Sequence, residues 1–202
     1  NQILVYDREG AFVRAFGCWG SMEGQFSDPR GLEFTADGEL VVADFGNDRV
    51  QVLREDGTFV RSIRSSGRGK DKLRTRSLRC PEDVCSCADG SIAVADHMSL
   101  HVQASDGEGG DLKIPGPKLS HFFRACGVCA GAGGEILAAD SVRGNVHVWN
   151  REGSFVQTIG RKGASRVDLY EPHGLCTDRE GRVFVECMTS RSIKSGRIVM
   201  LW

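Results

Sequence analysis

The apolar residues of positions 29–64 come in four short runs, each separated from the next by polar or turn-forming residues. The runs cover positions 31–34, 40–43, 50–53 and 59–63. Asp37-Gly38 separates the first run from the second, and Asp56-Gly57 separates the third from the fourth. A polar corner at 44–49 lies between the second and third runs. Asp-Gly favours a tight turn because glycine accepts a positive φ at little steric cost. The segment therefore predicts a meander of four antiparallel strands.

The same pattern returns along the rest of the chain. Its turn glycines recur at steps of 52, 44 and 47 residues. Four strands in a period of about 40–50 residues are typical of a β-propeller blade. Helical repeats of similar length would place apolar residues three and four positions apart, which these runs do not. The aligned glycines are Gly38, Gly90, Gly134 and Gly181, and the aligned strand-ending aspartates are Asp44, Asp96 and Asp140.

Several short motifs in this unit resemble the NHL-repeat family. They are the linker Gly24-Gln25-Phe26, the Pro-x-Gly-Leu that begins at Pro29, the Asn-Asp-Arg-Val-Gln-Val that begins at Asn47, and a Gly-x-Phe-Val at the fourth strand. The resemblance covers nearly the whole chain. It implies a propeller, usually six-bladed, with the Pro-x-Gly-Leu strand innermost. NHL propellers serve mainly as protein- or RNA-binding platforms, and a minority are enzymes such as the peptidylglycine-type amidating lyases.

We therefore predict an all-β chain of four-stranded antiparallel blades with no helix longer than about two turns. Residues 1–202 are expected to form a single NHL-type β-propeller domain, with a partial blade at 1–17 and another at 172–202. Full blades are expected at 29–64, 81–115 and 125–160. If the two partial blades combined into one blade and closed a ring, both of them would supply the third strand of that blade. The sequence therefore favours four to five blades of a six-bladed arc, continued outside these residues, over a closed five-bladed ring.

Composition narrows the range of partners and environments. The formal net charge of -1 argues against attraction of the whole molecule to nucleic acid or an anionic membrane. No apolar run approaches the roughly 18 residues that a membrane helix needs, so we expect a soluble protein without membrane insertion. The eight cysteines favour a reducing compartment. Cys85, Cys129 and Cys176 share the repeat position of Glu33, where we expect buried, unreactive thiols packed between blades.

The second residue of each Pro-x-Gly-Leu motif is expected to ring one solvated mouth of the propeller channel. In the amidating lyases a zinc-ligating histidine occupies this position, and a catalytic zinc takes about three protein ligands. Only one of the four residues here is a histidine. We therefore expect no catalytic residue, no metal and no cofactor, and we interpret the aspartate series as structural. The four channel-mouth residues are Arg30, Glu82, Cys126 and His173.

A dense run of basic residues follows the first full blade, opposed only by Asp71. It is expected in a loop between blades, either as a solvated spacer or as an arm that binds an anionic partner. Because the loop lacks aromatic residues that would stack on bases, an acidic protein is favoured over RNA. The residues of this basic run are Arg61, Arg64, Arg68, Lys70, Lys72, Arg74, Arg76 and Arg79.

These observations favour a non-enzymatic protein-interaction scaffold that acts as a subunit or binding platform of a larger assembly. The alternative is an RNA-binding NHL propeller. A zinc-dependent enzyme similar to the amidating lyases is the remote alternative.

Overall fold

The computed structural model describes residues 1–63, 78–97, 99–103, 112–113, 124–160, 169–188 and 196–201. Within these residues the only helix is a three-residue 3-10 turn at Phe45–Asn47, and all other regular elements are β-strands, as predicted. Among the same residues, no helix has the length and hydrophobicity needed to cross a bilayer. The chain divides into two compact units, residues 1–81 and residues 82–202, and each is described by itself.

The first unit contains a two-stranded and a four-stranded antiparallel sheet. The two-stranded sheet pairs β1 with β2, and blade 1 has the order β3-β4-β5-β6. Phe26, in the linker between the sheets, is fully buried against Ile3, Leu40 and Leu53. The strands of this unit are β1 (Ile3–Tyr6), β2 (Phe12–Phe16), β3 (Pro29–Phe34), β4 (Leu40–Asp44), β5 (Arg49–Leu53) and β6 (Phe59–Ile63).

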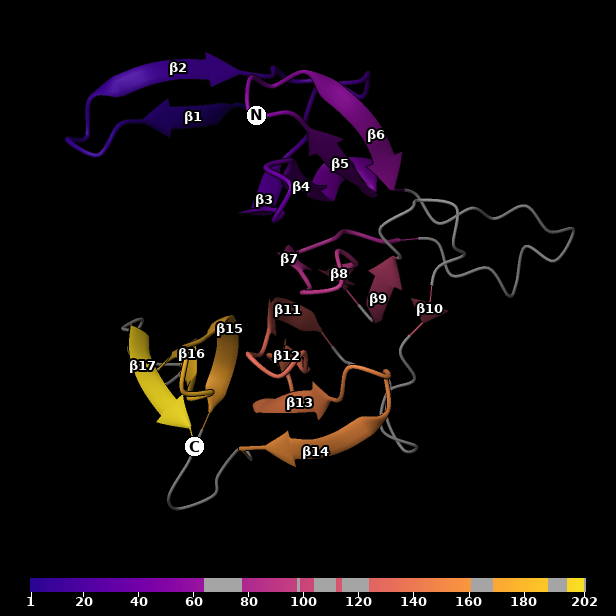
Figure 1. Cartoon of the computed structure of the whole chain (residues 1–202), viewed down its shortest axis with the longest axis vertical. Coiled ribbons are helices and arrows are strands. Elements are labelled where there is room, and N and C mark those ends of the chain that lie inside the picture. Colours follow the sequence, from indigo (N-terminus) through magenta and orange to yellow (C-terminus); the bar gives the residue numbers. More distant parts are fainter. Residues whose placement is uncertain are drawn as a thin grey trace, which may run out of the picture. The chain divides into compact units, whose positions relative to one another are not determined.

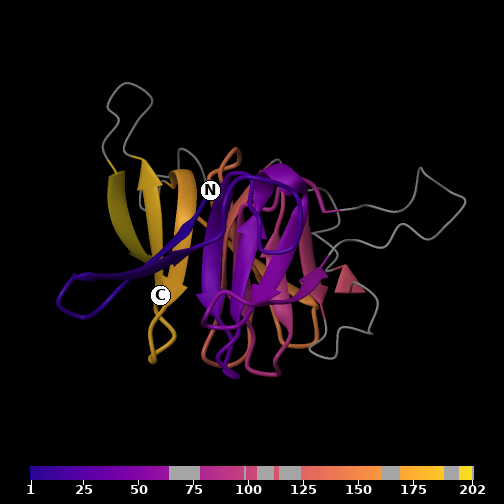
Figure 2. The ribbon, with the colours of Figure 1, turned by 90° about the horizontal axis from the view of Figure 1, so that it is seen from above.

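The second unit contains three sheets, each joined in sequence order (Figure 1). Blade 2 comprises β7–β10, blade 3 comprises β11–β14, and blade 4 comprises β15–β17, whose three strands lie side by side in Figures 1 and 2. The strands are β7 (Asp83–Ser86), β8 (Ile92–Ala95), β9 (Leu100–Gln103), β10 (Leu112–Lys113), β11 (Ala125–Ala130), β12 (Ile136–Asp140), β13 (Asn145–Trp149), β14 (Phe155–Ile159), β15 (Tyr170–Thr177), β16 (Val183–Met188) and β17 (Gly196–Leu201).

Each strand of blade 1 lies within two residues of its predicted run. In blade 4, β15 begins at Tyr170, two residues before the predicted start of that blade, and continues through two irregularities in its pairing with β16. The turn glycines behave as the sequence predicted, since Gly38, Gly90, Gly134 and Gly181 have φ values of 80°, 80°, 86° and 80°. The assignment of all 202 residues to one domain and the choice between an arc and a closed ring stay predictions.

Blade-on-blade packing forms the core of the second unit. Strand β11 contacts β7 on one side and β15 on the other. Cys85 and Val128 belong to the apolar cluster between blades 2 and 3, while Cys129 and Val185 belong to the cluster between blades 3 and 4. Because blades cover both faces of β12, its residues are all buried, which explains its uninterrupted apolar sequence.

The prediction for the three aligned cysteines is confirmed for Cys85 and Cys129, which are buried, but it is wrong for Cys176, which is exposed. At this repeat position the side chain faces the blade that follows in sequence. Cys85 is covered by blade 3 and Cys129 by blade 4. Among the described residues of the second unit, no blade follows blade 4, so nothing there covers Cys176.

The strand-ending aspartate of blade 1 is the centre of a buried hydrogen-bond network. Asp44 is fully buried, and its Oδ1 accepts a hydrogen bond from the Ser27 backbone N–H at 2.7 Å. Its Oδ2 accepts hydrogen bonds from Arg49 Nε at 2.7 Å, Asn47 Nδ2 at 2.9 Å and Gln51 Nε2 at 3.1 Å. The carboxylate therefore joins the linker before the blade to the corner between β4 and β5.

Arg49 extends this network to the linker. Its Nη1 donates to the Ser21 carbonyl at 3.0 Å, and its Nη2 donates to the carbonyls of Met22 at 2.8 Å and Gln25 at 2.7 Å. The side chain is 2% exposed, so its charge is stabilised by these acceptors and by Asp44, and not by water.

The other two strand-ending aspartates have the structural role that the sequence predicted. Asp96 Oδ1 accepts hydrogen bonds from the Ser99 N–H at 2.7 Å and the Ser99 hydroxyl at 2.8 Å. Asp140 Oδ1 accepts from the N–H groups of Val142 at 3.2 Å and Arg143 at 3.1 Å. Both carboxylates thus stabilise the corner that follows their own strand.

A buried histidine in blade 3 lies among aromatic rings. The ring centroid of His147 is 5.9 Å from that of Trp149 and 6.1 Å from that of Phe155. Its Nδ1 lies 2.9 Å from the Thr158 hydroxyl, which joins β13 to β14. Burial lowers the pKa of His147 below its ordinary value of 6.5.

Replacing Arg49 with Met should destabilise the fold strongly, because it leaves a buried carboxylate without its cation and removes one hydrogen bond from each of three linker carbonyls. Breaking a buried ion pair in this way costs about 3–5 kcal/mol. Urea titration followed by tryptophan fluorescence measures the loss. The exposed Arg54→Met change is the matched control and should cost less than about 0.5 kcal/mol. Similar midpoints for the two variants would contradict this role of Arg49.

The lowered pKa of His147 predicts a pH-dependent stability. The unfolded chain binds a proton at a higher pH than the folded chain, so stability should fall as the pH drops below about 6.5. His147→Gln should remove part of this dependence, whereas the exposed His97→Gln should leave it unchanged. Denaturant midpoints measured at pH 8 and pH 5.5 test this. An identical pH dependence in wild type and His147→Gln would contradict the prediction.

Thiol labelling should separate the cysteines by burial. In the native protein, Cys18 and Cys176 should react quickly with N-ethylmaleimide, since both are exposed. Cys85, Cys129 and Cys187 should react only after denaturation, because burial restricts access. Mass spectrometry of proteolytic peptides after timed labelling distinguishes the sites. Rapid native labelling of Cys85 or Cys129 would show that the blade interfaces open.

Candidate functional site

The residues predicted at the channel mouth differ in their surroundings. In the second unit, Glu82 is buried beside the start of β7 and its Oε1 accepts a hydrogen bond from Arg124 Nη2 at 3.2 Å. Cys126 in β11 is also buried, and its Sγ donates to Ser141 Oγ at 3.2 Å. His173 in β15 is half-buried. Glu82 and Cys126 are therefore held by their own chain, whereas we expected solvated residues.

Burial raises the pKa of the Cys126 thiol, although the hydrogen bond to Ser141 and the charge of Arg124 oppose this effect. A raised pKa disfavours the thiolate, which is the form that acts as a nucleophile or binds metal. Because burial outweighs the effects of Ser141 and Arg124, this environment as a whole does not activate Cys126. Among the described residues, no three histidine, cysteine, aspartate or glutamate side chains are grouped so that they could hold a metal ion.

Strand β11 approaches β15 closely beside these residues. A Cβ atom built on Gly127 would lie 1.9 Å from the carbonyl oxygen of His173, so only glycine fits there. The side chain of Asp83 accepts a hydrogen bond from the Val128 N–H at 3.0 Å and joins blade 2 to blade 3. The inner strands of the second unit are thus tightly joined.

In the first unit, Arg30 lies on β3 and makes local contacts. Its guanidinium carbon lies 3.4 Å from the centroid of the Phe45 ring, in cation–π geometry. Its Nη2 lies 3.3 Å from Asp28 Oδ2. The side chain remains partly exposed, and its charge is engaged by these local contacts.

Two members of the basic run lie in the described residues. Arg61 on β6 pairs with Glu39, with 2.9 Å between Nη1 and Oε2, so its charge is partly neutralised within blade 1. Arg79 is exposed. The other members, Arg64, Arg68, Lys70, Lys72, Arg74 and Arg76, lie outside the described residues.

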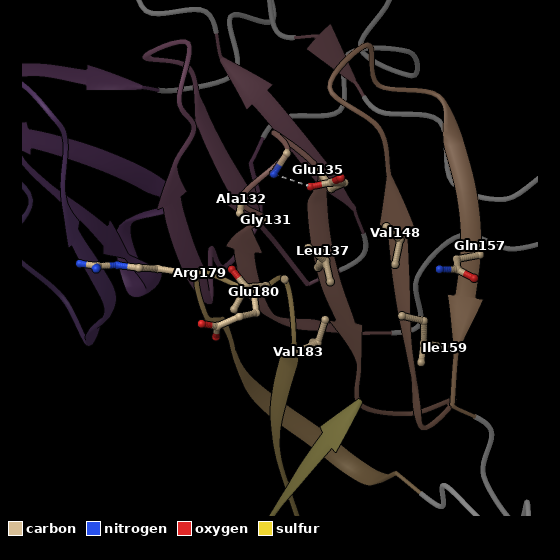
Figure 3. Close-up of a pocket in the computed structure, with 13 residues that line it drawn as sticks. Gly131, Ala132, Glu135, Leu137, Val148, Gln157, Ile159, Arg179, Glu180 and Val183 are labelled. Carbon is tan, nitrogen blue, oxygen red and sulfur yellow. Dashed lines mark hydrogen bonds between the residues drawn. The ribbon is translucent and has the colours of Figure 1, made fainter. Parts of the chain in front are cut away.

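A groove of about 350 Å³ opens between blades 3 and 4 (Figure 3). Its floor is apolar and consists of Leu137, Val148, Ile159 and Val183, contributed by strands β12, β13, β14 and β16. The tight turns at 131–134 and 178–181 border it. The polar residues of its rim are Glu135, Gln157, Thr177, Arg179 and Glu180.

The charged residues of the rim differ in their contacts and directions. Glu135 Oε2 accepts a hydrogen bond from the Gly133 N–H at 3.0 Å, which holds the carboxylate over the β11–β12 turn. Glu180 Oε2 accepts from Arg182 Nη2 at 2.8 Å. Figure 3 shows Arg179 extending away from the floor residues. Within the described part of the chain no cation pairs with Glu135, so this carboxylate is the one available to a ligand.

Sequence reasoning did not predict this groove. The glycine-rich turn at 131–134 was a visible signal, since it carries almost no side chain. The groove also depends on how residues of two different blades face one another, which the repeat alignment alone did not show.

Comparison with known proteins agrees with the repeat interpretation. The family model described as NHL repeat matches residues 26–53. Protein brain tumor of Drosophila melanogaster is 25% identical over 180 residues, covering 88% of this chain and 12% of that protein. The B-box type zinc finger protein ncl-1 of Caenorhabditis elegans is 28% identical over 179 residues, covering 88% of this chain and 15% of that protein.

A shorter match is higher in identity. The E3 ubiquitin-protein ligase TRIM32 of Homo sapiens is 36% identical over 104 residues, covering 48% of this chain and 16% of that protein. The chain therefore spans only about a sixth or less of the length of these relatives.

Solved structures show the same architecture. The virginiamycin B lyase of Staphylococcus aureus matches all of this chain and 62% of its own, with a TM-score of 0.66 and 13% identity. The WD40 β-propeller domain of Doa1 matches 96% of this chain and 55% of its own, with a TM-score of 0.61 and 15% identity. At such identities the likeness concerns the fold alone. Together with the four-stranded sheets and the aligned motifs, these matches show that the chain carries an NHL repeat at residues 26–53 and is built from the blades of a β-propeller.

Proposed function

We propose that this chain is a non-enzymatic interaction module that binds a protein partner as part of a larger assembly. The observation that carries the proposal is the groove between blades 3 and 4, which has a buried apolar floor and a charged rim. Such a combination suits a partner side chain, because apolar contact supplies affinity while the polar rim sets orientation.

The surroundings of the channel-mouth residues support the same proposal. Glu82 bonds to Arg124, and Cys126 donates to Ser141 with a raised pKa. These groups stabilise the scaffold, which leaves recognition to the surface turns and loops.

The basic run supplies a second contact in this proposal. Six of its eight residues fall within positions 64–76, so the segment carries a high local charge on a nearly neutral chain. An acidic segment of the partner would be attracted to it. RNA is the second candidate, and it is favoured only by this same density of positive charge.

Replacing Arg68, Lys70, Lys72, Arg74 and Arg76 with Ser should weaken binding of an acidic probe. Fluorescence anisotropy with a labelled decaglutamate peptide, and separately with a labelled single-stranded RNA oligonucleotide, measures this at several salt concentrations. We expect at least a ten-fold loss of affinity for the peptide and a smaller salt dependence, because fewer counterions are released. The free energy of unfolding should change by less than about 0.5 kcal/mol.

The control variant replaces the exposed residues Arg8, Arg54 and Arg151 with Ser and should bind as wild type does. Tighter binding of RNA than of the peptide, lost in the basic-run variant, would favour the second candidate. An unchanged affinity and an unchanged salt slope would make the basic run a spacer.

A further inference from the structure

We infer that the groove between blades 3 and 4 is a docking site for a partner segment that carries an aliphatic side chain next to a lysine or arginine. This inference rests on the proposed function and names the chemistry of the partner that the groove would accept.

The neighbouring blade interface carries a larger side chain at the position that opens the groove. Between blades 2 and 3, Cys87 packs against the apolar cluster that contains Trp149. Its counterpart at the next interface is Gly131, which opens its turn as Cys87 does.

One large-to-small difference therefore lies at the border of the groove, where a thiol-bearing side chain is replaced by hydrogen. Protein interiors are close-packed, and unfilled apolar space forfeits dispersion contacts. An apolar side chain from a partner would restore contacts that Cys87 makes within the chain at the preceding interface.

The floor of the groove suits an aliphatic group. Leu137, Val148 and Val183 are at most 6% exposed, and Ile159 packs against the same cluster. The volume of about 350 Å³ lies at the lower end of pockets that hold small ligands. It therefore fits one side chain and its flanking backbone better than an extended hydrophobic segment.

The rim selects a cation beside that aliphatic group. The Glu135 carboxylate is fixed over the turn by the Gly133 N–H, and no described cation neutralises it. The Glu180 carboxylate lies on the opposite turn and is already paired with Arg182. Because Arg179 extends away from the floor, the charge next to the apolar surface is negative (Figure 3). A lysine or arginine of the partner would complete a charge-assisted hydrogen bond with Glu135.

The full chain can be tested with three labelled peptides measured by fluorescence anisotropy. The first carries Leu flanked by Lys residues, the second carries Leu flanked by Glu, and the third carries Ser flanked by Lys, all within the same Gly-Ser frame. We expect the first peptide to bind at least ten-fold more tightly than either of the others. Equal binding of the first and third peptides would overturn the inference, since it would show attraction by charge without use of the apolar floor.

Two variants connect this binding to the groove. Glu135→Gln keeps the shape of the rim and removes its charge, so affinity for the first peptide should fall about three- to ten-fold. Gln157→Trp places a large side chain at an exposed position of the rim and should reduce affinity at least ten-fold. The matched control, Val156→Trp, lies on the same strand at a residue that is 54% exposed and outside the groove, and should bind as wild type does.

Unchanged affinity in both Glu135→Gln and Gln157→Trp would overturn the inference. Because Glu135→Gln changes no shape, it remains decisive even if Gln157→Trp disturbs the fold. Binding of the decaglutamate peptide by the basic run is measured separately. Failure of the groove therefore leaves that part of the proposed function standing, and failure of the basic run leaves the groove standing.

Discussion

Burial of the second strand in each four-stranded blade is the constraint on which the rest of this structure depends. A strand that is buried on both faces cannot alternate apolar and polar residues, so β4, β8 and β12 are apolar or small along almost their whole length. Burying a large aliphatic side chain contributes about 1.5–3 kcal/mol. The blades are thus stabilised mainly by their neighbours, and a difference in one residue at an interface changes the surface that the interface presents.

The polar groups that this packing encloses must be satisfied locally, and the three strand-ending aspartates achieve this in different ways. Asp44 binds the Arg49 guanidinium and the linker, Asp96 binds Ser99 and lies 3.0 Å from His101 Nε2, and Asp140 binds the amides of its own corner. What these blades share is a carboxylate that closes the corner after the second strand. Blade 1 adds the buried Arg49, which also donates to the carbonyls of Ser21, Met22 and Gln25, so one repeat position contributes unequally to different blades.

These differences explain how much the sequence could predict. Strand positions, turn glycines and the structural role of the aspartates follow from local patterns, because each depends on a few neighbouring residues. The burial of Cys85 and Cys129 followed from their shared repeat position, but Cys176 at the same position is exposed, since burial there depends on the following blade and not on the strand itself. The pairing of Arg61 with Glu39 could likewise not be predicted from the sequence, because the two residues lie 22 positions apart and are brought together only by the register of the strands.

The groove illustrates the same dependence on neighbouring blades. In a repeat protein each interface is built from corresponding residues, so an interface changes where a residue departs from its counterpart. Gly131 in place of Cys87 is such a departure, and it borders the groove. The Glu135 carboxylate is held over the same turn by the Gly133 amide, so the groove joins an apolar surface to a negative charge. The frame that supports this pairing is common to the repeat, whereas the residues that border the groove depart from their counterparts between blades 2 and 3.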